Sequence, residues 1–131
     1  MKTYKFYTPE ALLIEGYHVF DDVNDYVVTT SLGYSTADEP LARHLKSNER
    51  FEIFDGNFAW MNGLIKEIGQ KTLRPYDMQA LAAAWAYDTL EHPDETVFVT
   101  TRPQDIPIIN KYFGEDSIIV IGENNNEIEK N

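Results

Sequence analysis

The sequence predicts one α+β domain, with a β-rich first half that holds a hairpin and a short helix, a helical middle and a C-terminal βαβ unit. Its 131 residues are 43% hydrophobic and 13% aromatic, which is enough for one core. Short β-rich runs fill residues 1–55, an apolar helical run covers 76–90, and two apolar strands then flank a short helix. We expect this domain to span residues 1–122, with a flexible polar tail over 123–131.

The chain begins with a predicted strand over residues 4–8, which is short and aromatic. A helix should follow, because Thr8 suits the N-cap, Pro9 the first helical position and Glu10 the first turn. Gly16 would end this helix. It is only about two turns long, so residues inside it would also suit a strand.

Two β-rich runs, 17–20 and 26–30, are separated by the acidic segment 21–25. This composition is typical of a turn, so we expect a hairpin. A calcium loop needs oxygen ligands at alternate positions followed by glycine. Val23 and Tyr26 interrupt that pattern, and the segment therefore predicts a turn.

A second helix is expected from Asp38, which places Pro40 in the first turn, where its missing N–H costs nothing. Leu41, Ala42 and Leu45 would form its buried face. Residues after this helix, 50–54, alternate between apolar and polar side chains as in a strand.

The middle of the chain predicts two helices. Apolar residues at helical spacing cover 58–68, and Gly69 would end that run. Pro75 opens the second helix, over 76–90, whose alanine-rich centre at 80–86 is almost wholly apolar. Such a helix is buried on most sides.

The C-terminal part predicts a βαβ unit. Residues 96–101 and 117–121 are apolar strands, and a short helix capped by Asp105 and followed by Gly114 lies between them. Strands that are apolar on both faces and joined by a helix are typically parallel and buried.

The formal net charge of −11 makes sequence-independent binding to nucleic acid or to anionic lipid unfavourable. It favours a basic partner protein instead. The chain has no cysteine, which excludes disulfides and cysteine-based zinc sites. Its first residues lead into no long apolar run, so we expect neither a signal peptide nor a membrane span.

Motifs with an established chemistry are absent from the sequence. It contains no glycine-rich phosphate loop and no Gly-x-Ser-x-Gly elbow. His18, His44 and His92 have no other histidine at metal-ligand spacing. We therefore expect a protein that is not an enzyme and that has no cofactor and no metal site.

One pair of acids resembles a catalytic pattern. Asp77 opens the alanine-rich helix, and Asp105 follows a strand that leads into Thr101. This order, over residues 73–121, resembles the second half of PIN-domain nucleases. The resemblance implies magnesium-dependent phosphodiester cleavage with Asp77 and Asp105 as ligands. PIN domains also carry an acid in their first strand, and residues 4–8 contain none. As residues at helix starts, both acids would equally serve as caps.

A second resemblance lies in the first half, over Gly33 to Ile53. A strand there gives way to Thr36, two acids, a Leu-Ala-x-x-Leu helix and a short strand. This order resembles small proteins of tailed bacteriophages, whose genes lie among head and tail genes. The resemblance implies a non-enzymatic virion component, namely a capsid decoration protein, a connector or collar protein, or a tail accessory protein.

This virion role is the main prediction from the sequence. Such a protein would assemble in the host cytoplasm and contact other virion proteins in multiple symmetric copies. It would not touch nucleic acid or membrane directly. The alternatives are a divergent PIN-like nuclease that uses Asp77 and Asp105, and a small acidic cytosolic binding or inhibitor protein.

Overall fold

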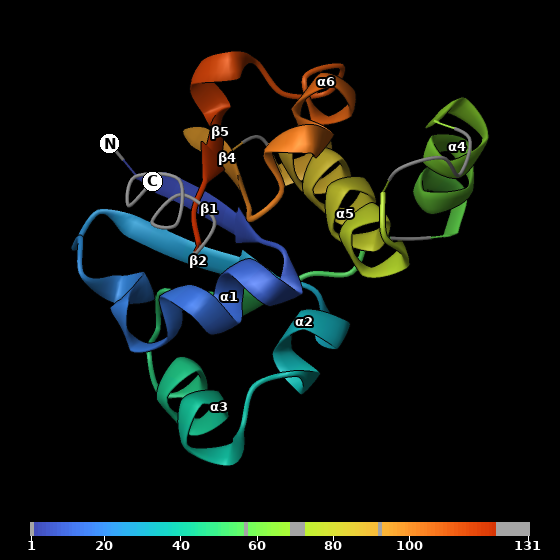
Figure 1. The fold of residues 1–131 in the computed structure, drawn as a ribbon. Coiled ribbons are helices and arrows are strands. Elements are labelled where there is room, and N and C mark those ends of the chain that lie inside the picture. The colour runs from blue at the N-terminus through green and yellow to red at the C-terminus, as the bar shows by residue number, and fades with distance from the viewer. Residues whose placement is uncertain (1, 57, 69–72, 92, 123–131) are drawn as a thin grey trace, which may run out of the picture.

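A single parallel sheet organises the molecule (Figure 1). The computed structural model describes residues 2–56, 58–68, 73–91 and 93–122. The strands are β1 (Thr3–Tyr7), β2 (Asp25–Thr29), β3 (Phe51–Ile53), β4 (Glu95–Thr100) and β5 (Ile118–Val120). They lie in the order β3-β2-β1-β4-β5, and each neighbouring pair is parallel. The predicted single-domain α+β class is confirmed.

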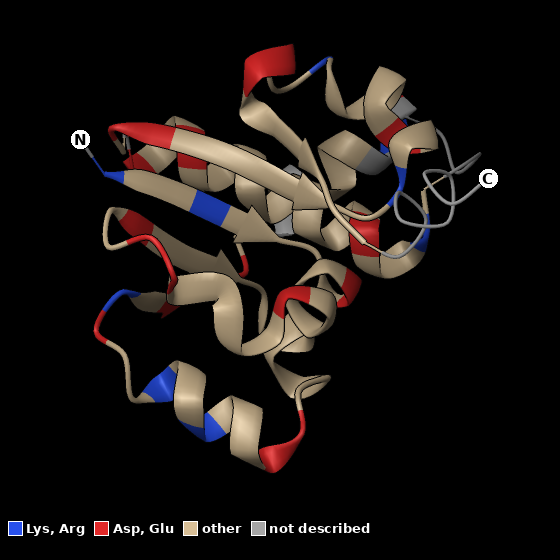
Figure 2. Ribbon diagram, turned by 60° about the vertical axis from the view of Figure 1, so that its left-hand side comes forward, with Lys and Arg blue, Asp and Glu red and all other residues tan. Residues whose placement is uncertain are grey.

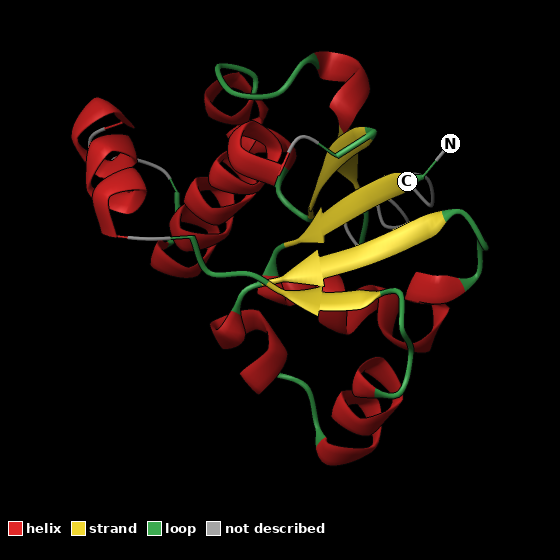
Figure 3. Ribbon diagram, turned by 180° about the vertical axis from the view of Figure 1, so that it is seen from behind, coloured by secondary structure: helices red, strands yellow, loops and turns green. Residues whose placement is uncertain are grey.

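Helices cover both faces of this sheet (Figures 1 and 3). They are α1 (Pro9–Glu15), α2 (Ser31–Ser35), α3 (Glu39–Lys46), α4 (Phe58–Ile68), α5 (Pro75–Glu91) and α6 (Ile106–Ile109). Short 3-10 helices are η1 (Gly16–Phe20), η2 (Pro103–Asp105) and η3 (Glu115–Ser117). Within the described residues, no helix combines the length and the apolar character that crossing a membrane requires.

The core has two layers because successive strand residues point to opposite faces. Phe6, Val28 and Phe98 pack on one face against α5 and the region of α6. Their strand neighbours, among them Tyr7 and Val27, pack on the other face against α1 and α3. α4 lies on the outer flank of α5, away from the sheet (Figure 1).

The predicted helix starts in the first half are confirmed. The Thr8 hydroxyl accepts a hydrogen bond from the Ala11 N–H at 3.4 Å, and the Asp38 carboxylate accepts one from the Leu41 N–H at 3.0 Å. Gly16 ends α1 at φ 56°, a value that glycine adopts without strain. Local capping chemistry therefore sets these boundaries.

The predicted hairpin is wrong. β2 pairs with β1 in parallel, with Thr3 opposite Asp25, and residues 16–20 form η1 rather than a strand. Parallel neighbours need a crossover that carries the chain back to the starting edge, and α1 with η1 provides it. In η1 only Val19 is buried, whereas Tyr17 is 53% exposed, so the β-rich composition there does not build a strand.

The C-terminal βαβ unit is confirmed, since β4 and β5 are parallel and α6 lies between them in the chain. β5 is a half-buried edge strand and not the fully buried strand that its composition predicts. The expected tail, 123–131, lies outside the described residues, as does Gly69.

The long helix is central to the core, as predicted. Ala83 and Ala84 are at most 1% exposed. The loop before α4 approaches the helix closely at Gly56, where an added Cβ would lie 3.4 Å from the Ala83 Cα. The small residues of α5 therefore allow the backbone of its neighbour to come into contact with it.

Candidate functional site

The sheet topology singles out the gap between β1 and β4. These strands are neighbours, yet the helices that follow them lie on opposite faces, α1 on one and α6 on the other. In open parallel sheets, ligands bind beyond the carboxyl ends of the strands at such a point. The side chains that the ends of β1 and β4 bring together, here called the carboxyl edge of the sheet, form the candidate site.

Glu10 enters this site from the first turn of α1. Its carboxylate accepts hydrogen bonds from the Thr101 hydroxyl, just beyond β4, and from Arg74 Nη2 at 3.2 Å. Both hydrogen bonds lower the pKa of Glu10, and the bond from Thr101 contributes more than the bond from Arg74. The side chain is still about half exposed, at 49%.

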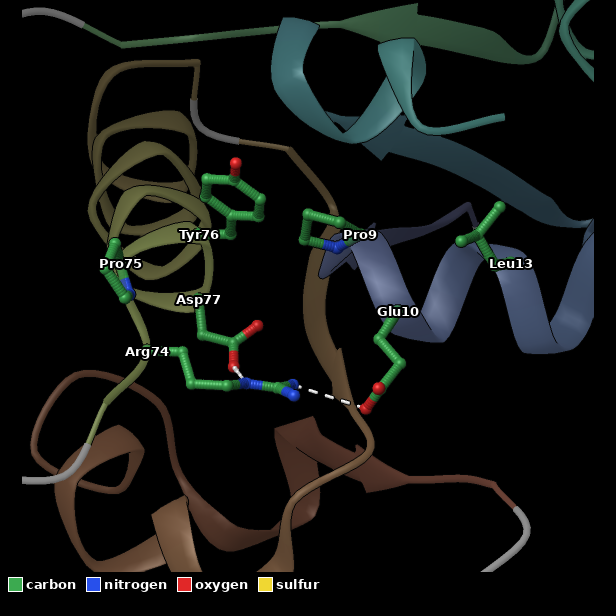
Figure 4. A pocket seen from close by; sticks show the side chains of 7 residues that line it. All are labelled: Pro9, Glu10, Leu13, Arg74, Pro75, Tyr76 and Asp77. Carbon is green, nitrogen blue, oxygen red and sulfur yellow. Dashed lines mark hydrogen bonds and ion pairs between the residues drawn. The ribbon is translucent and has the colours of Figure 1, made fainter. Parts of the chain in front are cut away.

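Arg74 connects Glu10 to the start of α5 (Figure 4). Its Nε donates to Asp77 Oδ2 at 2.8 Å, and the Asp77 carboxylate is almost fully buried. One guanidinium thus lies between two carboxylates, as the dashed lines in Figure 4 show. The sequence predicted Asp77 but not Glu10 or Arg74, which lie 64 residues apart.

Asp105 lies at the end of η2 and is fully buried. Its Oδ2 accepts a hydrogen bond from Arg102 Nε at 3.0 Å, whereas its Oδ1 has no hydrogen-bond partner among the described residues. Burial raises the pKa of Asp105, and the negative charge of Asp77 adds to this rise, while Arg102 opposes it.

The predicted capping role of Asp105 is wrong, because its side chain makes no capping hydrogen bond to α6. Arg102 lies one helical turn earlier and competes for the same carboxylate. Asp77 lies in the first turn of α5, as predicted, and its described partner is the Arg74 guanidinium.

The two acids of the PIN-like pattern therefore lie at the same end of the sheet, Asp77 through the Arg74 guanidinium that it shares with Glu10, and Asp105 just after β4. Glu10 adds a third carboxylate near them. Two arginines of the same chain, Arg74 and Arg102, hold these acids. Within the part of the chain that the structure describes, no group of three histidine or acidic residues has the geometry to hold a metal ion.

A hollow of about 540 Å³ opens beside this cluster, between the starts of α1 and α5 (Figure 4). Glu10, Arg74 and Asp77 supply its charged wall. Leu13 and Tyr76, which are 45% and 53% exposed, supply an apolar rim. The hollow is suited to a short polar group that carries an apolar stem.

His18 and His44 are not among the side chains of this edge. His18 is exposed on η1 and pairs with Asp21 at 2.9 Å, although a strand was expected there. His44 is on α3, as predicted, and its ring centroid lies 4.9 Å from that of Tyr17. His92 lies outside the described residues.

Comparisons of the chain with protein families, with curated proteins and with solved structures found no match. What the carboxyl edge does must therefore be inferred from its own side chains. Three carboxylates there face two guanidinium groups, and Thr101 adds a hydroxyl donor.

Proposed function

We propose that the protein is a non-enzymatic component of a tailed-bacteriophage particle and acts through contacts with other virion proteins. One observation supports a protein without enzymatic activity: the carboxylates at the carboxyl edge are bound by arginines of the same chain. Arg74 holds Glu10 and Asp77, and Arg102 holds Asp105. Charge-assisted hydrogen bonds of this kind are strong, so these carboxylates already have partners within the chain.

The helix and strand of the later part of residues 33–53, α3 and β3, follow the order seen in small head and tail proteins and support the particle role, whereas residues 33–35 are helical (α2) and not the strand that the resemblance implies. The net charge of −11 favours a basic protein surface as partner and disfavours direct contact with nucleic acid or anionic lipid. Acidic residues are spread over most elements, and α3, within this segment, carries the basic Arg43 and Lys46 together with the acidic Glu39 (Figure 2). Decoration, connector or collar, and tail accessory proteins all act in symmetric copies after assembly in the host cytoplasm.

The test is quantitative mass spectrometry of purified particles of the encoding phage. We expect the chain at a fixed copy number per particle that matches a symmetry of the capsid, neck or tail. A chain found only in the unassembled fraction of the lysate would overturn the particle role. A core capsid protein from the same particles provides the reference for copy number.

A second candidate function, metal-dependent phosphodiester cleavage, is favoured by a different observation. Asp77 and Asp105 both lie at the carboxyl edge, and Asp105 keeps one buried oxygen without a described partner. In the described structure these carboxylates and Glu10 are not arranged to hold a metal ion, so a site for a divalent ion that activates water would form only after they move together. This arrangement requires Arg74 to leave both of its carboxylates.

The two candidates are separated by incubating the purified protein with single-stranded RNA or DNA and magnesium or manganese. Our proposal expects no cleavage and no metal-dependent change in melting temperature. Cleavage that needs the metal and disappears in Asp77→Asn would establish the nuclease. Asp94→Asn, an exposed acid outside the site, is the matched control.

A further inference from the structure

The opposite end of the sheet carries a second hollow, of about 310 Å³, on the face that α5 covers. Tyr4 and Tyr26 lie next to each other there, at matching positions near the starts of β1 and β2. Tyr87 contributes from α5, and Glu49 and Glu52 contribute from the segment of β3. The hollow thus combines aromatic rings with carboxylates.

The three tyrosine rings form a continuous wall. The ring centroids of Tyr4 and Tyr26 are 5.0 Å apart, and those of Tyr4 and Tyr87 are 6.0 Å apart. Tyr87 is buried, whereas Tyr4 and Tyr26 are partly exposed and border the opening. The face of an aromatic ring is electronegative, so such a wall attracts a cation.

The surrounding carboxylates strengthen this attraction. Glu52 accepts a hydrogen bond from the Tyr87 hydroxyl at 3.0 Å, and the charges of Glu52 and Glu91 add to the rise in the pKa of Tyr87 that burial causes. Glu49 is exposed at the rim. The tyrosine ring faces and the two glutamate carboxylates therefore all contribute negative potential to the hollow.

Two basic groups of the chain lie next to the hollow. Arg50 lines it, but its guanidinium donates to the backbone carbonyls of Phe20, Asp22 and Asp25 at 2.7–3.2 Å, at the turn before β2. Lys2 places its ammonium 5.1 Å from the centroid of the Tyr26 ring. A ring of this wall therefore already associates with an alkylammonium group of the chain itself.

We propose that this tyrosine–glutamate hollow binds the side-chain ammonium of a lysine on a basic partner protein. The choice of a lysine follows from charge: electronegative ring faces and carboxylates complement an ammonium group, and the hollow accommodates its alkyl stem. Tyr4 and Tyr26 are partly exposed and Glu49 is exposed, so a partner segment can reach the hollow. The inference deepens the proposed binding role and rests on it for its biological use.

The test is an NMR titration of the full chain with the peptide acetyl-Gly-Lys-Gly-amide at low salt. We expect saturable shifts of the Tyr4 and Tyr26 ring signals. The norleucine counterpart of the peptide keeps the alkyl stem without the charge and should leave both signals unmoved. Exposed cation–π contacts are weak, so Tyr26→Leu should weaken binding about two- to fivefold.

Glu52→Gln is a second variant that should keep the fold, because the glutamine carbonyl still accepts the hydrogen bond from the Tyr87 hydroxyl. We expect it to weaken binding about two- to fivefold. Tyr17→Leu, at a half-exposed tyrosine of η1 that does not line the hollow, is the matched control and should leave the affinity unchanged.

Equal shifts with the norleucine peptide would overturn the inference, as would unchanged affinity in both Tyr26→Leu and Glu52→Gln. Tighter binding of the corresponding arginine peptide would overturn the choice of lysine. Because the titration uses purified protein, its failure is distinct from failure of the particle role. If the chain is present in particles but its tyrosine signals do not respond to the lysine peptide, this inference is wrong and the particle role is unaffected.

Discussion

The two ends of the sheet use the same residue type, the carboxylate, in opposite ways. At the carboxyl edge, Glu10 and Asp77 share one guanidinium, and Asp105 is held by another. At the amino edge, the end of the sheet where the strands begin, the described partner of Glu52 is the Tyr87 hydroxyl. Glu49 is exposed there, beside the partly exposed rings of Tyr4 and Tyr26.

This difference indicates which edge is available to a partner. A carboxylate that is paired with an arginine already has a cationic partner, and a new cation must displace that arginine. A carboxylate that accepts from a neutral phenol keeps its charge and the capacity to accept more hydrogen bonds. The carboxylates of the carboxyl edge are therefore paired with arginines of the chain, whereas Glu52 and Glu49 at the amino edge have no such pair among the described residues, although Lys2 lies over the Tyr26 ring there.

The largest expected effect concerns α5, which carries Asp77 to one edge and Tyr87 to the other. Ala84→Phe should lower the free energy of unfolding by about 1–3 kcal/mol, because the site is fully buried and overpacking strains the core. Both edges should unfold together in one calorimetric transition. Two resolved transitions would contradict the single cooperative domain. Leu90→Phe, at a half-exposed position, is the control.

The next effect tests whether the carboxyl edge is structural. Arg74→Ala should cost about 1–2 kcal/mol in urea unfolding, since it leaves the buried Asp77 carboxylate without its partner. Arg43→Ala removes an exposed pair with Glu39 and should change stability little. Equal effects of the two variants would show that the carboxyl-edge pairs are no more important than a surface pair.

A smaller effect is expected at the amino edge. Tyr87→Phe keeps the ring and removes the hydrogen bond to Glu52, so it should cost about 0.5–1.5 kcal/mol. Tyr76→Phe, at a half-exposed position, serves as the control for the change itself. If Tyr87→Phe costs nothing, Glu52 is not fixed by the phenol and the wall of the hollow is less ordered than the structure indicates.

The smallest effect is the pH dependence of stability. Folding lowers the pKa of Glu10 below 4.5, so its contribution is present above that pH and is lost as pH falls through the lower, folded value. Because the group is half exposed, the contribution should stay below about 1 kcal/mol. Urea unfolding of wild type and Glu10→Gln should therefore diverge as pH rises and converge in acid.

Asp105 should show the opposite sign. Its pKa is raised above 3.8 on folding, so the wild type loses stability relative to Asp105→Asn as pH rises through the folded value. Parallel stability curves for wild type and Asp105→Asn would contradict the buried state of this carboxylate.

Local features of the fold could be predicted from the sequence. The caps at Thr8 and Asp38 and the end of α1 at Gly16 depend on residues within one turn of each other. The pairing of strands, in contrast, depends on residues that are far apart in the sequence. Residues 17–20 have a β-rich composition, but the choice between a hairpin and a crossover depends on β4, which takes the place beside β1.

The candidate site could be predicted only in part, for the same reason. Asp77 and Asp105 stand out because each lies at a helix start, whereas Glu10 and Arg74 join them through the tertiary fold. Arg102 lies three residues before Asp105, a spacing that could have indicated their ion pair. The tyrosine wall gave no sequence signal, because Tyr4 and Tyr87 meet only when α5 packs on the sheet.

The central position of β1 has a consequence for biosynthesis. β1 is made first, yet the strand that pairs along one of its two sides is β4, with Thr3 opposite Glu95. Closing a loop of this length costs entropy before any contact is gained, and long-range parallel pairing folds slowly. While the ribosome makes the middle of the chain, that side of β1 has no strand to pair with. We expect the nascent protein to be most prone to aggregation in this interval, which ends when β4 emerges.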